Sequence, residues 1–430
     1  MIKLTNIYIK TFGCALNQSD SELMAGMLKK EGHKIVDDET KADVVIINSC
    51  TVKNEAETKF FREIEKHKNK KIILAGCIPQ AEKSLIESKL KNYSIIGTSQ
   101  ISKIGLVVEQ TLLENKVVMI EKSKNKRLNL PKIRKNELIE IIPISEGCLG
   151  ACTYCKTKQA RGELFSYSED EILKELETAV KNGVKEIFLT SQDLGAYGKD
   201  INSNLPRLLK KLSNIKGDFK IRLGMCNPNF AIEYLDELKE ILKHEKFYKF
   251  IHLPVQAGSD ETLKKMGRKY LSKDFEKVVK TLRKEIPNIT IATDIIVGFP
   301  TESDEDFKKT LNLLKSTTPD VINMSRFWKR PGTFAFNMKQ LDTKIIKKRS
   351  LELKEVCEKI MLEQNKKWIN WEGEVLVQEI GKNNTLTCRN YSYKTIVLDN
   401  NNFKLGQKVN VKINSATKWD LRAKILDTNN

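Results

Sequence analysis

Short apolar runs alternate with charged, amphipathic runs over roughly the first 120 of the 430 residues. Three of these runs predict buried strands: NIYIKTF (6–12), ADVVIINS (42–49) and KIILAG (71–76). Residues 19–32 predict a helix with Ser19 or Asp20 as its N-cap and Gly32 at its end, and residues 55–68 predict another. This strand–helix–strand order indicates an α/β fold with a doubly wound parallel sheet.

The same alternation returns between about residues 138 and 335, with helical segments such as 168–183 and 272–286 between apolar runs. Six runs predict strands: LIEIIPIS (138–145), VKEIFLTS (184–191), FKIRLGM (219–225), FIHLPVQ (250–256), ITIATDIIVG (289–298) and DVINMSRFW (320–328). Six such units predict a partial (β/α)6 barrel, an open relative of the eight-fold barrel. Its active site is expected at the carboxyl ends of the strands.

The last segment differs in pattern from the first two. A charged helical stretch, from about residue 342 to 370, leads to short apolar runs separated by Gly and Asn. Such runs predict a small antiparallel β-barrel of OB-like size. The expected domains are 1–120, 138–370 and 371–430, and the polar, basic segment 121–137 is the expected linker.

Basic residues exceed acidic ones, with 75 Lys and Arg against 56 Asp and Glu and a formal net charge of +19. This excess favours a polyanionic partner such as nucleic acid, although lysine-rich helix faces exposed to solvent also produce it. The first residues do not read as a signal peptide, and no apolar run approaches the ~20 residues of a membrane span. We therefore expect a cytoplasmic protein, in which clustered cysteines more often bind metal than form disulfides.

The strongest chemical signal is CxxxCxxC, formed by Cys148, Cys152 and Cys155 directly after the first barrel strand. Thiolates suit zinc or iron–sulfur clusters, but structural zinc usually takes four ligands and the sequence places no fourth Cys or His nearby. With Tyr154 before the last cysteine, the motif resembles the radical S-adenosylmethionine superfamily. That resemblance implies a [4Fe-4S] cluster whose open iron binds the methionine end of S-adenosylmethionine, and cleavage of this cofactor to an adenosyl radical.

Polar residues at other strand ends of the barrel are candidates for holding that cofactor. Ser191, Gln192 and Asp193 follow the second strand, Arg222 lies in the third, and Gln256 ends the fourth. Arg222 suits a carboxylate, because a guanidinium pairs with it through two hydrogen bonds. Ordinary barrel packing would equally account for each of these residues.

Three further cysteines occupy matching places in the N-terminal sheet. Cys14, Cys50 and Cys77 each follow a predicted parallel strand. Neighbouring strands lie roughly 5 Å apart, so thiols at their carboxyl ends could meet at one cluster. The alternative is three unrelated buried cysteines.

The remaining cysteines carry weaker signals. Cys357 and Cys388 are predicted to be structural, and the role of Cys226, at the barrel mouth in GMCNP, stays open. Basic residues of the last segment are expected to contact RNA: Lys394, Lys404, Lys408, Lys412, Lys418 and Arg422.

The whole chain resembles the methylthiotransferases of the radical S-adenosylmethionine superfamily, with an N-terminal three-cysteine domain, a radical core and a C-terminal TRAM barrel. The pieces that carry the resemblance are TFGCALNQSDSE, INSCTVKNEAE, LAGC, EGCLGACTYCKTKQARG, RLGMCNP, HLPVQAGSD and DIIVGFPTE. CTYCKTKQARG and GMCNP are most similar to the archaeal and eukaryotic branch, which acts on N6-threonylcarbamoyladenosine at position 37 of tRNA.

This resemblance implies insertion of a methylthio group at carbon 2 of that adenine, with two [4Fe-4S] clusters and S-adenosylmethionine as cofactors. It also implies an electron donor, a sulfur source and the anticodon stem-loop of tRNA as partners, and no catalytic residues beyond the cluster ligands. Two rival substrates are isopentenyladenosine of tRNA and an aspartate of a ribosomal protein. A rival of another class is a non-catalytic RNA-binding protein stabilised by metal.

Overall fold

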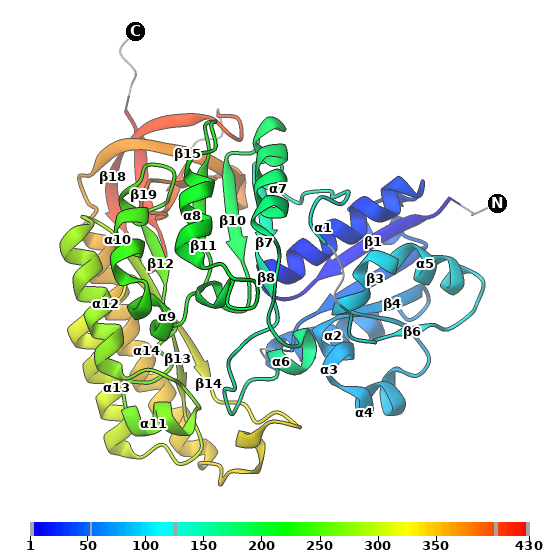
Figure 1. Cartoon of the computed structure of the whole chain (residues 1–430), viewed down its shortest axis with the longest axis horizontal. Helices are drawn as coiled ribbons and strands as arrows, with labels where there is room; N and C mark the ends of the chain where they lie inside the picture. The colour runs from blue at the N-terminus through cyan, green and yellow to red at the C-terminus, as the bar shows by residue number, and fades with distance from the viewer. Residues whose placement is uncertain (1–3, 52–53, 124–126, 400–402, 427–430) are drawn as a thin grey trace.

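The computed structural model describes residues 4–51, 54–123, 127–399 and 403–426. It has three parts in chain order: a parallel sheet with helices on both faces, an open parallel barrel and a small closed β-barrel (Figure 1). The predicted α/β fold class is confirmed. Residues 124–126 of the predicted linker lie outside the described residues.

The N-terminal sheet has six parallel strands in the order β2-β1-β3-β4-β5-β6. Its strands are β1 (Asn6–Thr11), β2 (Lys34–Ile35), β3 (Val44–Ser49), β4 (Lys71–Gly76), β5 (Ser94–Gly97) and β6 (Val118–Met119). Its helices are α1 (Ala15–Lys30), α2 (Asn54–Lys66), α3 (Cys77–Ala81), α4 (Lys83–Leu85) and α5 (Ile104–Leu112), with short turns η1 (Glu39–Lys41), η2 (Ile86–Leu90) and η3 (Thr98–Lys103). The strand order reverses between β1 and β3, and such a switch point opens a crevice at the carboxyl ends of the strands.

Two apolar cores, one on each face, make the sheet doubly wound. Leu23 and Val107, from α1 and α5, pack on one face, and Phe60 of α2 packs on the other with Leu90. The strands between these layers are apolar on both sides, which explains their continuous hydrophobic runs.

The predicted start of the first helix was wrong. Helix α1 begins at Ala15, with Cys14 at the N-cap position, so Ser19 and Asp20 lie inside the helix. The sequence SDSE resembles a capping signal because a Ser followed three residues later by a Glu is typical of a helix start. Here Asp20 is instead buried and paired with arginines from distant segments.

The central part contains all six predicted barrel strands: β7 (Ile139–Pro143), β10 (Glu186–Thr190), β11 (Lys220–Leu223), β12 (Phe250–His252), β13 (Thr290–Val297) and β14 (Val321–Arg326). A two-stranded ribbon, β8 (Ser145–Glu146) with β9 (Phe165–Ser166), flanks the first strand. The helices are α6 (Thr157–Arg161), α7 (Glu169–Lys181), α8 (Leu205–Ser213), α9 (Pro228–Glu233), α10 (Leu235–Lys243), α11 (Asp260–Lys265), α12 (Ser272–Glu285), α13 (Asp304–Thr317) and α14 (Thr343–Lys366), with turns η4 (Leu194–Ala196) and η5 (Phe334–Asn337).

These six strands form one curved, open sheet in chain order. Strands β7, β10 and β11 pair in parallel, as do β12, β13 and β14, and the bridge between Met225 and His252 joins the two halves. Residues such as Ile187 and Leu189 pack outward against helices in the main hydrophobic core. The alternate positions, including Phe188 and Arg222, therefore face the barrel interior.

The C-terminal part is a closed barrel with strand order β15-β16-β17-β19-β18. Its strands are β15 (Glu372–Ile380), β16 (Leu386–Arg389), β17 (Thr395–Leu398), β18 (Lys408–Ala416) and β19 (Leu421–Ile425), with the turn η6 (Lys382–Asn384). The strands pair antiparallel except β17 with β19, which pair in parallel. Strand β16 was not predicted, because its four residues LTCR carry only a weak apolar alternation.

This barrel packs against the amino ends of the central strands. Gln378 and Tyr393 both donate hydrogen bonds to Glu186, the first residue of β10, and Lys249, just before β12, donates its amide to the Tyr391 carbonyl over 2.8 Å. In Figure 1 the closed barrel accordingly lies at the end of the central part where the strand arrows begin. The carboxyl ends of the strands are at the opposite end.

The expected role of Lys394 in RNA contact was wrong. Its ammonium group is buried and lies 2.8 Å from Asp320 Oδ1 and 3.1 Å from Asn365 Oδ1, which joins the closed barrel to the central part. Lys408 and Lys418 are also paired, with Asp218 and Glu358.

Among the described helices, none is long and apolar enough to cross a membrane.

Replacing Lys394 by Ala should lower the free energy of unfolding by about 3–5 kcal/mol, because it leaves the buried Asp320 carboxylate without its closest cation. Chemical denaturation measures this change. Lys404→Ala is the matched control, because that side chain is exposed and its loss should change stability by less than about 0.5 kcal/mol. Equal stability of the two variants would contradict the structural role of Lys394.

Candidate functional site

The loop after β8 carries Cys148, Cys152 and Cys155 at the carboxyl end of the central barrel. A Cβ atom placed on Gly150 would lie 3.3 Å from Cys148 Sγ and 3.7 Å from Cys152 Sγ, so both sulfurs border one small space. The Gly150 amide donates to Cys148 Sγ over 3.2 Å. Burial, with smaller contributions from Asp193 and the neighbouring thiols, raises the pKa of Cys148 to about 11. A cation bound to Cys148 would therefore be needed to hold it as a thiolate.

A chain of hydrogen bonds surrounds these cysteines. Arg268 donates to the Tyr154 hydroxyl over 2.6 Å and to Asn227 Oδ1 over 2.7 Å, and Asn227 Nδ2 donates to Asp193 Oδ2 over 2.6 Å. Burial raises the pKa of Asp193 to about 6, against the hydrogen bonds that its carboxylate accepts from Asn227 and Gly195. Arg268 and Asn227, which were not predicted, thus link Tyr154 and Asp193, which were.

The other predicted cofactor residues occupy different places. Ser191 and Gln192 follow β10, and among the described residues the Ser191 Oγ and Gln192 Oε1 atoms are buried without a hydrogen-bond partner. Gln256 follows β12 in a left-handed backbone conformation (φ 70°), and its amide donates to the Asp294 carbonyl over 2.8 Å. These three residues lie at carboxyl ends of strands, where a ligand would be held.

Arg222 lies lower in the barrel interior. Its guanidinium carbon is 3.9 Å from the centre of the Phe188 ring, 4.9 Å from that of Phe250 and 5.3 Å from that of Tyr393. Among the described residues its Nε atom is buried without a hydrogen-bond partner. The structure therefore puts Arg222 with an aromatic cluster next to the closed barrel, not with the Arg268–Asp193 group.

In the N-terminal sheet, Cys14, Cys50 and Cys77 follow β1, β3 and β4 at the switch point. The Asn17 side chain lies among them: its Oδ1 is 3.4 Å from Cys14 Sγ and its Nδ2 is 3.9 Å from Cys77 Sγ. A Cβ on Gly13 would lie 2.8 Å from Cys50 Cβ. The structure brings all three predicted cysteines to one end of the sheet, as their places after the strands predicted.

Helices α3 and α6 bring the two triads near each other. Helix α3 begins at Cys77, helix α6 begins two residues after Cys155, and the two helices pack together. An ion pair between Lys156 and Glu82 joins the segments. Arg330 lies close enough to Cys50 and Cys155 for its charge to act on both, and burial lowers its pKa.

A buried group of four charges holds α6 against the N-terminal part. Asp20 of α1 pairs with Arg127, from the predicted linker, and over 2.6 Å with Arg161 of α6. Arg127 also pairs with Glu146 over 2.5 Å, so the group contains two cations and two anions. Burial raises the pKa of the Cys77 thiol, and the Arg161 charge opposes that rise.

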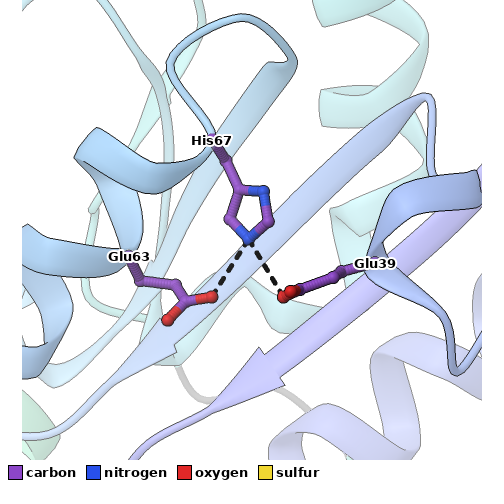
Figure 2. Close-up of side chains that lie close together, drawn as sticks. All are labelled: Glu39, Glu63 and His67. Carbon is purple, nitrogen blue, oxygen red and sulfur yellow. Dashed lines mark hydrogen bonds and ion pairs between the residues drawn. The ribbon is translucent and has the colours of Figure 1, made fainter.

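A different group of side chains has the spacing of a mononuclear metal site. The ligand atoms of Glu39, Glu63 and His67 lie within 4.8 Å of one another, with the His67 ring directed at both carboxylates (Figure 2). However, Lys66 pairs with both glutamates, so a cation already compensates their charge. His67 lies before β4, at the amino ends of the strands, whereas the cysteines lie at the carboxyl ends. The group of Glu39, Glu63 and His67 joins η1 to α2.

The spacing of the sulfur atoms in the cysteine triads differs from the ligand spacing of a mononuclear metal site. In neither triad do all three described sulfurs lie within 4.8 Å of one another. One tetrahedral zinc ion, with Zn–S bonds of about 2.3 Å, would hold its sulfurs roughly 3.8 Å apart. A four-iron cluster binds each thiolate to a different iron and so accepts a wider spacing. The triads therefore fit a cluster better than a single ion.

The other three cysteines are packing residues. Cys357 and Cys388 lie in the central and C-terminal hydrophobic cores, as predicted, and burial raises the pKa of each to about 12. Cys226, whose role the sequence left open, is buried beneath Gly195, where an added Cβ would approach its sulfur to 2.9 Å.

Family models match each of the three parts of the chain. Residues 6–97 match the Uncharacterized protein family UPF0004, residues 142–314 match the Radical SAM superfamily, and residues 371–426 match the TRAM domain. A probable threonylcarbamoyladenosine tRNA methylthiotransferase of Pyrococcus horikoshii is 41% identical over 92% of this chain and 94% of its own. The human threonylcarbamoyladenosine tRNA methylthiotransferase is 43% identical over 96% of this chain and 73% of its own.

This chain belongs to the threonylcarbamoyladenosine tRNA methylthiotransferase family. Identity of this level extends over nearly the whole chain, the family models span both cysteine triads and the closed barrel, and the predicted family is confirmed.

Solved structures support the fold of this family member. The radical S-adenosylmethionine methyltransferase TsrM of Kitasatospora setae aligns with a TM-score of 0.56 and 14% identity, over 78% of this chain and 77% of its own. The cobalamin-dependent S-adenosylmethionine radical enzyme OxsB aligns with a TM-score of 0.54 and 13% identity, over 83% and 56% of the two chains. At such identities the likeness concerns the fold alone.

The residues of this family member fit the cofactors of a radical S-adenosylmethionine enzyme. Gly150 leaves open the space that a side chain would fill between two sulfurs, and the buried Ser191 and Gln192 oxygens after β10 offer unused hydrogen-bonding capacity. Three thiols per triad are the donor set of a cluster with one open iron.

Several residues at the two triads were missed, although most lie inside the quoted motifs. Asn17 and Asp20 belong to TFGCALNQSDSE, Arg161 to CTYCKTKQARG, and Asn227 to GMCNP. An amide or a charged residue within a motif was the available signal. Whether such a residue is buried depends on the tertiary packing of the motif, which the sequence does not show. Arg268 lies in none of the motifs.

Replacing Asp20 by Asn should lower the free energy of unfolding by about 3–5 kcal/mol, because Arg127 and Arg161 would lose their shared buried anion. Denaturation of the full chain measures this loss. Asp37→Asn, at an exposed position, is the control and should change stability by less than about 0.5 kcal/mol. An unchanged stability of Asp20→Asn would show that the four charges do not hold α6 in place.

Proposed function

We propose that this protein inserts a methylthio group at carbon 2 of N6-threonylcarbamoyladenosine at position 37 of tRNA. The observation that carries the proposal is the meeting of two cysteine triads, from two different parallel sheets, across α3 and α6. Generation of the adenosyl radical needs only one such triad, so the second is assigned to sulfur transfer. Similarity to threonylcarbamoyladenosine tRNA methylthiotransferases supports the choice of nucleoside.

In this proposal Cys148, Cys152 and Cys155 hold one [4Fe-4S] cluster, and Cys14, Cys50 and Cys77 hold the other. When bound, the two clusters and S-adenosylmethionine supply one-electron reduction, radical activation of a C–H bond and sulfur. Radical chemistry suits the target, because an aryl C–H group resists removal of its hydrogen by ordinary acid–base groups. No side chain beyond the cluster ligands is assigned a catalytic role.

The residues proposed to bind S-adenosylmethionine are Tyr154, Ser191, Gln192, Asp193, Arg222 and Gln256. Burial of the unpaired Ser191 and Gln192 oxygens supports a polar ligand at the end of β10. Arg268, through its bond to the Tyr154 hydroxyl, would fix that ring next to the cluster. Arg222 is the least supported member of the set, because its charge already rests on three aromatic rings.

The proposed partners follow from the same chemistry. The anticodon stem-loop of tRNA is the substrate, and an external electron donor and a sulfur source are needed for repeated turnover. The proposed compartment is the cytoplasm, where thiols stay reduced, and none of the nine cysteines, all among the described residues, is in a disulfide. The division into domains 1–120, 138–370 and 371–430, with 121–137 as a linker, is part of the proposal. No strand of the N-terminal sheet, the central strands or the closed barrel pairs with a strand of another of these parts among the described residues, which supports it.

Anaerobic reconstitution with iron and sulfide should give about eight irons per chain. Cys152→Ala should abolish reductive cleavage of S-adenosylmethionine, whereas Cys50→Ala should keep cleavage and lose the methylthio product, because each removes a ligand from one centre only. Cys357→Ala, in a hydrophobic core away from both centres, is the control and should keep both centres. Full methylthio activity of Cys50→Ala, or zinc in place of iron, would exclude the proposed pair of clusters.

Deletion of the gene should remove the methylthio form of N6-threonylcarbamoyladenosine from cellular tRNA and leave its precursor. Mass spectrometry of tRNA nucleosides measures both. Loss of the methylthio form of isopentenyladenosine instead, or an unchanged tRNA profile with loss of methylthio-aspartate from a ribosomal protein, would assign the chain to a rival substrate.

A further inference from the structure

The segment after β14 combines exposed aromatic rings with basic side chains. Trp328 is 52% exposed, Phe334 72% and Phe336 37%, which is unusual for large aromatic side chains in a chain with ample core. The segment extends from the carboxyl end of β14, the end of the barrel that carries the cysteine loop (Figure 1). These three rings thus belong to a segment at the same end of the barrel as the cysteine loop. This carboxyl end is the mouth of the barrel.

The backbone of this segment is fixed to the cysteine loop, so the rings are not exposed through loose packing. The Ala335 amide donates to the Thr153 carbonyl over 2.9 Å, and Gln159 of α6 donates to the Gly332 carbonyl over 2.5 Å. Ala335 is fully buried, and the buried Phe327 ring packs edge-on against Phe299 at 5.4 Å. The exposed rings are therefore held in place before a ligand arrives.

The charge around the rings selects the kind of ligand. From residue 321 to residue 341 the sequence contains no Asp or Glu, while Arg326, Lys329 and Lys339 are exposed. Lys329 Nζ lies 5.6 Å from the centre of the Phe336 ring. Aromatic rings interleaved with cations bind single-stranded nucleic acid, because bases stack on the rings and phosphates pair with the cations.

The closed barrel does not reach this mouth. It packs on Glu186, Lys249 and Asp320, at the amino ends of the strands, whereas the cysteine loop lies at the carboxyl ends. Strands β10 and β13, of five and eight residues, separate the two ends by roughly 17 and 26 Å. Bases next to the reacting nucleotide need contacts supplied at the mouth itself.

We infer that Trp328, Phe334 and Phe336 form a stacking platform for the unpaired bases that flank the target nucleotide in the anticodon loop. This inference rests on the proposed function and adds the site by which the loop is held. Sequence-specific RNA proteins commonly splay loop bases onto aromatic side chains, whereas duplex RNA offers no free base faces. The platform should therefore distinguish a stem-loop from a duplex.

The test uses the full reconstituted chain and a synthetic anticodon stem-loop with 2-aminopurine beside the target adenosine. Trp328→Ala and Phe334→Ala should each lose the stacking of one base. Each variant should therefore bind the stem-loop roughly 5- to 150-fold more weakly than the wild type and quench 2-aminopurine fluorescence less. Trp328→Phe should restore both. Leu113→Ala, which truncates a side chain 62% exposed in the N-terminal part, is the matched control and should bind as the wild type does.

Two further measurements separate stacking from other effects. Binding of a duplex made from the same stem should be equal in wild type and Trp328→Ala, because phosphate contacts remain. The variants should also cleave S-adenosylmethionine without RNA as the wild type does, and their iron content should be unchanged. These two results would show that the variants fold and bind their clusters.

Wild-type affinity of Trp328→Ala and Phe334→Ala for the stem-loop would overturn the platform and leave the rings as a surface for a protein partner. An equal loss of duplex and stem-loop binding would also overturn it. Neither result bears on the nucleoside profile of the deletion strain, so failure of the platform is distinct from failure of the proposed function.

Discussion

A single buried carboxylate, Asp20, connects three segments that are far apart in the sequence. It pairs with Arg127 and Arg161, and so ties α1 to the segment before the barrel and to the helix that follows the cysteine loop. Burying these charges is tolerable because each has an opposite partner. The position of α6, and with it the approach of Cys155 to Cys77, depends on this group.

That approach explains how one chain combines two centres. Each triad is built by its own sheet, through the general property that loops at the carboxyl ends of parallel strands converge. What is particular to this protein is the contact between α3 and α6, because two sheets could each form a triad without facing each other. Arg161 reaches from the central part to the charge environment of Cys77, so the surroundings of the N-terminal triad are not made only of its own domain.

The strands and the cysteines could be predicted because both depend on local pattern. Runs such as VVIINS and KIILAG are apolar on both sides, and a cysteine after each run needs no further information to be placed at the sheet end. Strands β2 and β6 have two residues each and leave too short a pattern. Asp20 and Lys394 were misread because a charged residue in a polar stretch reads as exposed, and only tertiary packing reveals its buried partner.

The closed barrel also limits how the central barrel can be entered. Gln378 and Tyr393 meet Glu186 inside the amino end, and Tyr393 packs on Tyr248 at 4.8 Å between ring centres, so that end is filled with side chains. The carboxyl end, which carries the cysteine loop, is then the end of the barrel left to ligands. If the proposed stem-loop sits at that mouth, it would cover it, and the cofactor would bind before the tRNA and its fragments would leave after it. On that proposal the docking of the last domain would set an order of binding and release, although it lies at the far end from the chemistry.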